Sequence, residues 1–114
     1  MTRQIILQGF NWASHTHKRW NYNLKNMTKY YSDCKVTKLW LPPLSKSHGD
    51  EGYFPDDYYN FDSKYGTSKD LWELVDECNK YDIEPIGEII SWTCLPKFCR
   101  EKFFVFGHRY FLIF

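Results

Sequence analysis

Hydrophobic positions along the chain alternate between short apolar runs and stripes with helical spacing. The runs lie at residues 4–10, 36–41 and 84–90 and are rich in Ile, Leu and Val, which is typical of buried strands. Pro42 and Pro43 follow the second run. Because proline cannot donate to a sheet ladder, we expect that strand to end at Leu41.

Two segments between these runs carry apolar side chains at spacings of three or four, which predicts amphipathic helices. Thr67 and Ser68 are candidate N-caps of the second helix, and Asp70 adds negative charge to its first turn. That helix is expected to end around residues 81–82. The stripes consist of Trp20, Leu24, Met27, Tyr31 and Cys34 in the first helix and Leu71, Leu74, Val75 and Cys78 in the second.

The predicted order is β-α-β-α-β, and helical crossovers between strands require a parallel sheet with right-handed connections. An open, doubly wound sheet and a (β/α)₈ barrel both satisfy this pattern. The first strand ends in QGF, so the GxGxxG turn of dinucleotide-binding folds is missing. The conspicuous polar and aromatic clusters follow strand ends, at Asn11-Trp12, residues 49–67 and Ser91-Trp92, where parallel α/β folds carry function.

The bulk composition places the chain among globular proteins of one modest domain. It has 114 residues, 43% hydrophobic and 25% charged, and a net charge of +1, which argues against a nucleic-acid partner. The N-terminal apolar run is too short for a secretory signal, and the C-terminal run from residue 103 is too short to span a bilayer. We therefore expect no membrane association and a cytoplasmic location.

Four cysteines raise the question of a metal site. Cys34 and Cys78 fall on the apolar faces of the predicted helices, where a thiol behaves as a small hydrophobe. Cys94, Cys99 and His108 could bind zinc, but a structural zinc site has four ligands and no fourth candidate lies nearby. Reduced thiols without a metal are the preferred interpretation.

The stretch GDEGYFPDDYYNFDSKYGT, residues 49–67, combines the two kinds of contact that a sugar needs. Flat aromatic rings can cover the apolar face of a pyranose, and carboxylates or amides can bind its hydroxyls. The alternative is structural: the rings pack onto the rim of the sheet and the acidic groups are solvated. The candidates are Trp12, Tyr53, Phe54, Tyr58 and Tyr59 for the rings, and Asn11, Asp50, Glu51, Asp56 and Asp57 for the polar groups.

Four motifs now become recognisable in order: ILQGFNW (6–12), KLWLPPLSKS (38–47), GYFPDDYYNFDSKYGT (52–67) and PIGEII (85–90). Together they resemble the opening of a plant-like α-amylase, a glycoside hydrolase built on a (β/α)₈ barrel. The resemblance implies that residues 1–90 are the N-terminal part of the catalytic barrel, a partial (β/α)₈ TIM barrel with its first three strands and two helices. The implied substrate is an α-1,4-glucan such as starch or glycogen.

The resemblance also implies roles for individual residues. Tyr53 matches a tyrosine that stacks on the sugar ring beside the cleaved bond, and Trp12 matches a tryptophan at the rim of the same cleft. Asn11 helps to shape the turn at Trp12, and these three residues form the expected substrate-binding set. Asp62 and Tyr65 are expected to hold the loop to the barrel.

The resemblance stops after Ile90. The family continues there with Asn-His, where the Asn helps to bind calcium and the His contacts substrate; this chain has Trp92 at the calcium position, so no cofactor is expected. Residues 91–114 form an unmatched aromatic-rich tail, containing six of the nine Phe residues. We interpret this tail as the translation of an intron or of a shifted reading frame.

No catalytic residue can be assigned. Retaining glycosidases use two carboxyl groups about 5–5.5 Å apart. In the family that this chain resembles, those two groups and a third, supporting Asp stand at the ends of strands four, five and seven, and Glu88 matches a structural position. We expect an inactive, poorly soluble fragment that aggregates through open sheet edges and its Phe-rich tail, with no prediction of oligomeric state. The alternative is a small non-catalytic module that binds glucan through Tyr53 and Trp12 or docks a protein through the tail.

Overall fold

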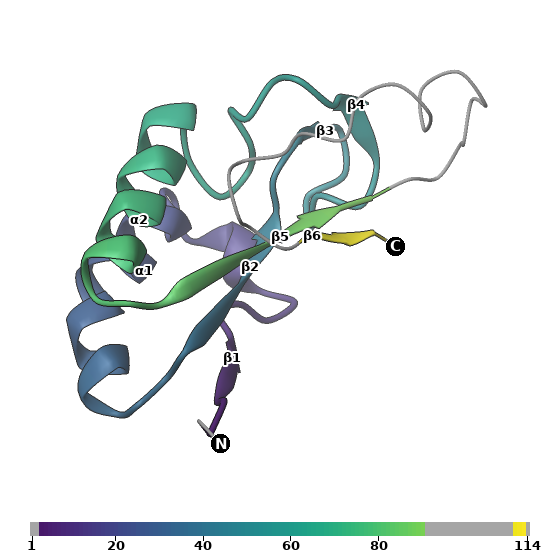
Figure 1. Ribbon diagram of the computed structural model, residues 1–114. Helices are drawn as coiled ribbons and strands as arrows, with labels where there is room; N and C mark the ends of the chain where they lie inside the picture. The colour runs from purple at the N-terminus through teal and green to yellow at the C-terminus, as the bar shows by residue number, and fades with distance from the viewer. Residues whose placement is uncertain (1–2, 91–110, 114) are drawn as a thin grey trace.

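The computed structural model describes residues 3–90 and 111–113. Within them, parallel strands alternate with two helices, and a small hairpin is inserted before the second helix (Figure 1). The elements are β1 (Ile6–Gln8), the 3-10 turn η1 (Ser14–Thr16), α1 (Trp20–Asp33), β2 (Lys38–Pro43), β3 (Lys46–Ser47), β4 (Pro55–Asp57), α2 (Ser68–Lys80), β5 (Glu84–Ile89) and β6 (Phe111–Ile113).

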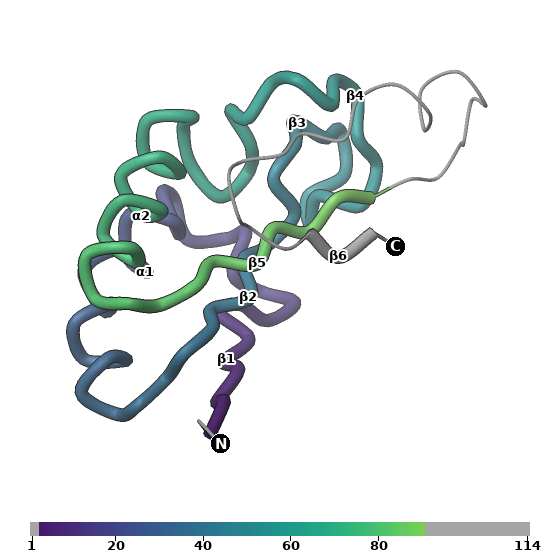
Figure 2. The backbone as a smooth tube through the Cα atoms, viewed as in Figure 1, coloured from purple at the N-terminus to yellow at the C-terminus, as the bar shows by residue number. Residues whose placement is uncertain are grey.

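The main sheet has the order β1-β2-β5-β6, and each neighbouring pair is parallel. Leu39 of β2 is in register with Leu7 of β1 and Pro85 of β5. Both helices lie on the same side of the sheet and pack against each other (Figure 2). The predicted parallel β-α-β-α-β arrangement is thus confirmed, and β1, β2 and β5 follow chain order without the reversal that marks a doubly wound sheet.

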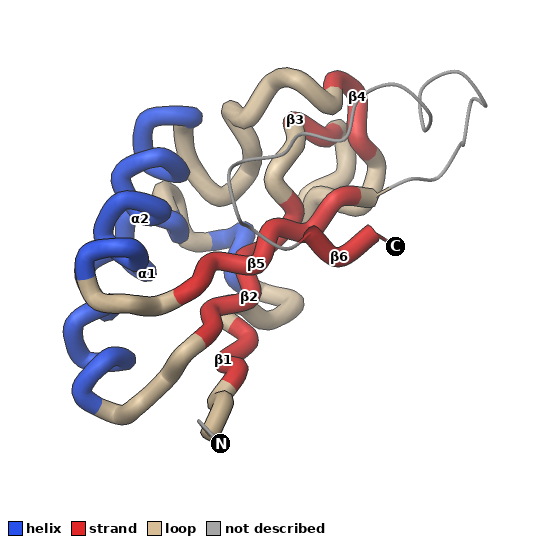
Figure 3. The backbone as a smooth tube through the Cα atoms, viewed as in Figure 1, coloured by secondary structure: helices blue, strands red, loops and turns tan. Residues whose placement is uncertain are grey.

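Two strand pairings were not predicted. β3 and β4 pair antiparallel inside the stretch that we expected to be one long loop (Figure 3). β6 lies in the tail and pairs with β5, Gly87 standing in register with Phe111. Strands of two or three residues are too short to leave a hydrophobic periodicity, so the sequence pattern gives no signal for them.

The prediction that β2 ends at Leu41 is wrong. The strand continues through Pro42 and Pro43, and its register with β5 shifts between Trp40 and Pro43. A bulge tolerates proline because the ladder is locally interrupted there. Pairing resumes at once, since the Leu44 amide donates to the Glu88 carbonyl over 3.3 Å.

The core lies between the helices and the sheet. Its fully enclosed side chains include Leu39, Leu74 and Cys78, so the interpretation of Cys78 as a small hydrophobe is confirmed. Cys34 is exposed and that part of the prediction is wrong, because the residue forms the C-cap of α1 and has left the helical face. Met27 is also exposed on α1.

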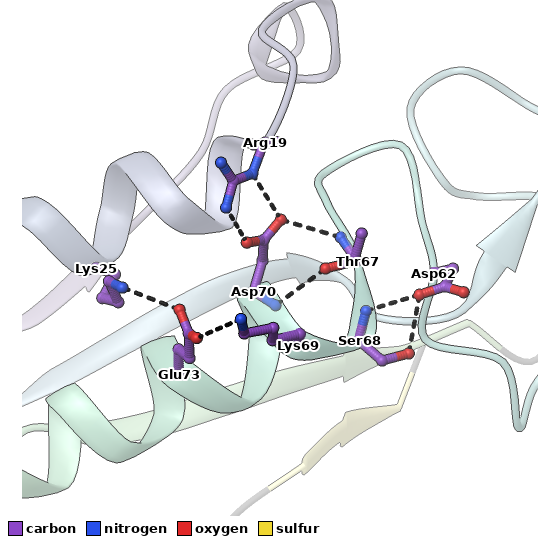
Figure 4. A network of polar contacts seen from close by, with 8 residues as sticks. All are labelled: Arg19, Lys25, Asp62, Thr67, Ser68, Lys69, Asp70 and Glu73. Carbon is purple, nitrogen blue, oxygen red and sulfur yellow. Dashed lines mark hydrogen bonds and ion pairs between the residues drawn. The ribbon is translucent and has the colours of Figure 1, made fainter.

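The N-termini of α1 and α2 are tied together by one polar network (Figure 4). Thr67 is the N-cap of α2 and forms a capping box with Asp70, as the sequence predicted. The Asp70 carboxylate is almost fully buried and accepts two bonds from the Arg19 guanidinium, 2.7 Å from Nη2 and 3.2 Å from Nε. Arg19 itself is the N-cap of α1, so one carboxylate sets the relative position of both helices.

No helix in residues 3–90 combines the length and hydrophobicity needed to cross a bilayer.

Replacing the N-cap oxygen should weaken α2. We expect Thr67→Ala to lower the free energy of unfolding by about 1 kcal/mol, because the Asp70 amide loses its acceptor. Urea unfolding followed by far-UV circular dichroism measures this. Thr67→Ser keeps the oxygen and is the matched control; equal losses in both variants would contradict the capping role.

Acid should weaken the same network. The hydrogen bond from Arg19, helped by bonds from Thr67, lowers the pKa of Asp70 although burial opposes the shift. A lowered pKa gives stability that is present above the ordinary aspartate pKa of about 3.9 and is lost as the pH falls through the folded value. Urea unfolding at a series of pH values from neutral to acid should therefore show that the free energy of unfolding falls more steeply for the parent than for Asp70→Asn. If the free energy of unfolding depends on pH in the same way for both proteins, Asp70 makes no such contribution.

Candidate functional site

The carboxyl ends of β1 and β2 bring two aromatic residues together from separate loops. Trp12 follows β1, and Tyr53 lies between β3 and β4. Their rings are stacked, with centroids 6.3 Å apart and planes only 13° from parallel. Trp12 is 72% exposed and Tyr53 is half-buried, so the Trp12 ring is open to solvent and the Tyr53 ring is partly covered by the protein.

The hairpin that carries Tyr53 is fastened by the hydroxyl of Ser47, which is buried. This oxygen donates to the Phe54 carbonyl over 2.7 Å and accepts from the amides of Gly49 and Phe54. Gly52, next to Tyr53, has φ +92°, and a β-carbon there would lie 2.9 Å from Cβ of Pro43. The turn therefore requires glycine and presses directly on β2.

The rest of the long connection is held as the resemblance implied. Tyr65 is fully buried, its hydroxyl donates to the Glu51 carbonyl over 2.7 Å, and its own carbonyl accepts from the Asn21 amide over 2.9 Å. Asp62 accepts from the Ser68 amide and hydroxyl at the start of α2 (Figure 4). Both residues serve the loop, which positions the hairpin over the sheet.

Asn11 is exposed, and its side chain is used within its own turn. The carboxamide oxygen accepts from the Ala13 amide over 2.9 Å, and the Asn11 amide donates to the Ser14 hydroxyl over 2.9 Å. These bonds fix the turn that presents Trp12. The structure thus brings Trp12 and Tyr53 together and places Asn11 beside them as part of the turn.

Glu88 of β5 lies beneath Tyr53 and is only 3% exposed. Its carboxylate accepts a bond from the Trp40 indole N–H, 3.0 Å from Oε2, and the Tyr53 hydroxyl lies near enough to influence its pKa. Burial raises the pKa of Glu88, while both donors oppose the shift. Sequence reasoning found Glu88 but not its connection to the aromatic pair; Trp40, half-buried on β2, was missed, because a bond between strands leaves no spacing signal.

The same surroundings change the pKa of the Tyr53 phenol. Burial, followed by the nearby charge of Glu88 and the hydrogen bond to it, raises the pKa of Tyr53 to about 12. A buried hydroxyl next to a carboxylate resists ionisation because the phenolate would be both desolvated and repelled. Tyr53 is therefore a neutral hydrogen-bond donor throughout the physiological range.

The acidic candidates of the hairpin are engaged locally. Asp56 contacts His48, with 2.6 Å between Oδ1 and Nδ1; Asp57 accepts from the Tyr59 amide over 3.0 Å; and Asp50 lies 3.6 Å from the Lys64 ammonium. Phe54 and Tyr59 are exposed. These carboxylates stabilise the loop itself, which leaves the stacked pair as the distinctive feature of this edge.

Two sets of residues that the sequence raises for metal binding lie outside the described residues. These are Trp92, at the calcium position, and the zinc candidates Cys94, Cys99 and His108. Within residues 3–90 and 111–113, no three His, Cys, Asp or Glu side chains are grouped as a metal ion would require.

Alkaline titration should reveal the environment of Tyr53. We expect one tyrosine to ionise near pH 12, against about 10 for a free phenol, and its signal to be missing in Tyr53→Phe. NMR of tyrosines labelled with ¹³C at Cζ measures this. A raised pKa gives stability that is present below pH 10 and lost as the pH rises toward 12; a Tyr53 signal titrating near 10 would contradict the buried contact with Glu88.

Comparisons with known proteins agree on one family. Residues 23–93 match the model described as alpha amylase, catalytic domain. The chain is 38% identical over 87 residues to Alpha-amylase 3, chloroplastic, and 35% identical over 88 residues to Probable alpha-amylase 2, both from Arabidopsis thaliana. These alignments cover 76% and 77% of this chain but only 10% and 21% of those two proteins.

A solved structure supports the same relationship. The α-amylase from Geobacillus thermoleovorans, crystallised in complex with acarbose, superposes with a TM-score of 0.57 at 30% identity. The match covers 61% of this chain and 16% of that enzyme. The similarity in sequence and in structure thus extends over a small part of each relative.

Proposed function

This chain belongs to the α-amylase family, and we propose that it forms part of the (β/α)₈ barrel of a glycoside hydrolase that acts on α-1,4-glucans such as starch or glycogen. Within that enzyme, this chain would form one wall of the substrate cleft. The stacked pair of Trp12 and Tyr53 at the carboxyl ends of the strands is the observation that carries the proposal.

The sheet supports the barrel. Three successive parallel strands lie in chain order with both helices on one face, which is the repeating unit from which a closed (β/α)₈ barrel is built. A barrel places its active site at the carboxyl ends of the strands, and Trp12 and Tyr53 both follow such ends. The fold and the position of the pair therefore favour the same function.

The chemistry of the pair supports a sugar ligand. Aromatic rings offer a flat apolar surface, and the open Trp12 ring extends that surface away from the half-buried Tyr53. The relative from Geobacillus thermoleovorans was crystallised in complex with acarbose. An α-glucan is accordingly the ligand that we propose for this wall.

Hydrolysis requires a pair of catalytic carboxyl groups in addition to this aromatic surface. Asp70 and Glu88 are the buried carboxylates in the part of the chain described, and Asp70 is committed to Arg19 and the cap of α2. Glu88 alone cannot supply both the nucleophile and the acid of a retaining mechanism. We therefore propose that this chain by itself binds glucan without cleaving it. A non-catalytic glucan-binding module would share this behaviour.

Glucan binding by the full chain should depend on the stacked pair. We expect Trp12→Ala and Tyr53→Ala each to raise the dissociation constant for a linear maltooligosaccharide about five-fold or more, because each removes roughly 1 kcal/mol of stacking. Isothermal titration calorimetry measures the change. Tyr30→Ala removes an exposed aromatic ring from α1 and is the matched control.

Absence of binding by the parent chain, or equal effects of all three substitutions, would overturn the proposed sugar site. The same preparation should release no reducing sugar from starch. Measurable hydrolysis that survives Glu88→Gln would show that a catalytic pair exists elsewhere in the chain and would refute the non-catalytic assignment.

A further inference from the structure

We propose that Trp20 and Tyr65 are positioning residues that keep the rings of Trp12 and Tyr53 close enough to stack. Each of them binds a backbone carbonyl of the loop that carries one of the two rings, and the first turn of α1 connects the two contacts. The glucan in this inference rests on the proposed function, whereas the contacts themselves are present without a ligand.

The Trp12 loop is held at the point where it leaves β1. Gly9 directly follows β1, and its carbonyl accepts from the indole N–H of Trp20 over 2.8 Å. The Gly9 amide donates to the Trp40 carbonyl, also over 2.8 Å, so both polar groups of this residue are fixed. Gly9 is closely surrounded as well, since an added β-carbon would lie 3.0 Å from Cδ1 of Leu39 and 3.1 Å from the Trp40 carbonyl oxygen. The chain therefore begins its path toward Trp12 from a defined position.

The turn beyond Gly9 is closed by its own hydrogen bonds. The Asn11 amide donates to the hydroxyl of buried Ser14 over 2.9 Å, and the Ser14 amide donates to the Asn11 carbonyl over 3.2 Å. The Trp12 carbonyl lies 2.9 Å from Nδ1 of His15. Because the turn is fixed internally, a displacement at Gly9 moves Trp12 with it.

The Tyr53 loop is held by Tyr65. The hydroxyl of this buried residue donates over 2.7 Å to the carbonyl of Glu51, two residues before Tyr53. The Tyr65 carbonyl accepts in turn from the Asn21 amide over 2.9 Å. Asn21 is the second residue of α1 and directly follows Trp20. Two adjacent residues at the start of one helix thus hold both loops, one through its indole and the other through its backbone amide.

The start of α1 is itself firmly placed. Its N-cap, Arg19, has φ 61°, in the left-handed region that residues other than glycine rarely adopt. The Arg19 guanidinium binds the buried Asp70 carboxylate of the α2 capping box (Figure 4). The Trp20 ring packs against the core and lies 5.3 Å from the ring of His17, between centroids. The two loops therefore share one support that is tied to both helices.

Each donor can be removed with a matched control. Tyr65→Phe removes only the hydroxyl, and Trp20→Phe removes the indole N–H together with part of the ring. Tyr31→Phe and Trp72→Phe remove the same atoms from two residues that also pack against the core from α1 and α2. The controls therefore carry the same loss of packing without the contacts to the two loops.

Stacking can be measured in the full chain without any sugar. The NMR signals of the labelled Tyr53 ring should carry a ring-current shift that is lost in Trp12→Ala. Trp20→Phe and Tyr65→Phe should each reduce this shift, and their matched controls should not. An undiminished shift in either positioning variant, or an equal reduction in its control, overturns the inference.

If Trp20→Phe does not fold, benzothienylalanine at position 20 replaces it in the experiment, because this residue keeps the two fused rings and lacks the N–H. It should reduce the shift of the Tyr53 ring in the same way. An undiminished shift with this residue overturns the role of Trp20.

Sugar binding provides a second readout. Trp20→Phe should raise the dissociation constant for a linear maltooligosaccharide about five-fold, the effect of losing one stacked ring. In a Trp12→Ala background it should have no further effect, because no ring remains for Trp20 to position. Losses that multiply in the double variant overturn the inference. If the parent chain shows the ring-current shift but binds no maltooligosaccharide, the proposed function fails, and the positioning of the rings is decided by the shift alone.

Discussion

Parallel pairing of β1, β2 and β5 fixes where the other parts of this chain can lie. Each strand must return to the same end of the sheet before the next begins, so the long segments cross one face as α1 and α2. At the carboxyl ends of β1 and β2 the chain leaves the sheet, first through the turn at Trp12 and then through the β3–β4 hairpin. The aromatic pair is therefore a consequence of strand direction together with the residues that follow each strand.

The long connection before α2 shows why many of its polar residues do not form a ligand site. A segment without extended sheet or helix has backbone groups that need partners. Ser47, Asp62 and Tyr65 supply these partners, and Asp70 joins the end of the connection to Arg19. Many polar side chains of this stretch therefore form hydrogen bonds that hold the loop in place and do not form a ligand site.

Sequence reasoning predicted the elements with strong local signals. Leu71, Leu74 and Cys78 repeat over a full helix, and the Thr67 cap and Asp70 mark its start, so α2 was predicted closely. The predictions were wrong where tertiary contacts determine the local structure. A bulge lets β2 continue through Pro42 and Pro43, and Cys34 is exposed because α1 ends before it. The aromatic candidates of the site were found by type and place, but the bond from Trp40 to Glu88 joins residues 48 positions apart and has no local trace.

The two rings of the site are supported in different ways, and this difference bears on how a glucan would be recognised. Trp12 is 72% exposed and depends on its turn, so its ring can adjust to a ligand at little energetic cost. Tyr53 is half-buried and follows Gly52, whose turn packs closely on Pro43 of β2, so a displacement of its ring would disturb a tightly packed turn. A sugar that stacks across both rings would have its position defined by the fixed Tyr53, with Trp12 adapting to it. Because the Gly52 turn packs on Pro43, the position of Tyr53 is defined relative to β2 and therefore to the sheet.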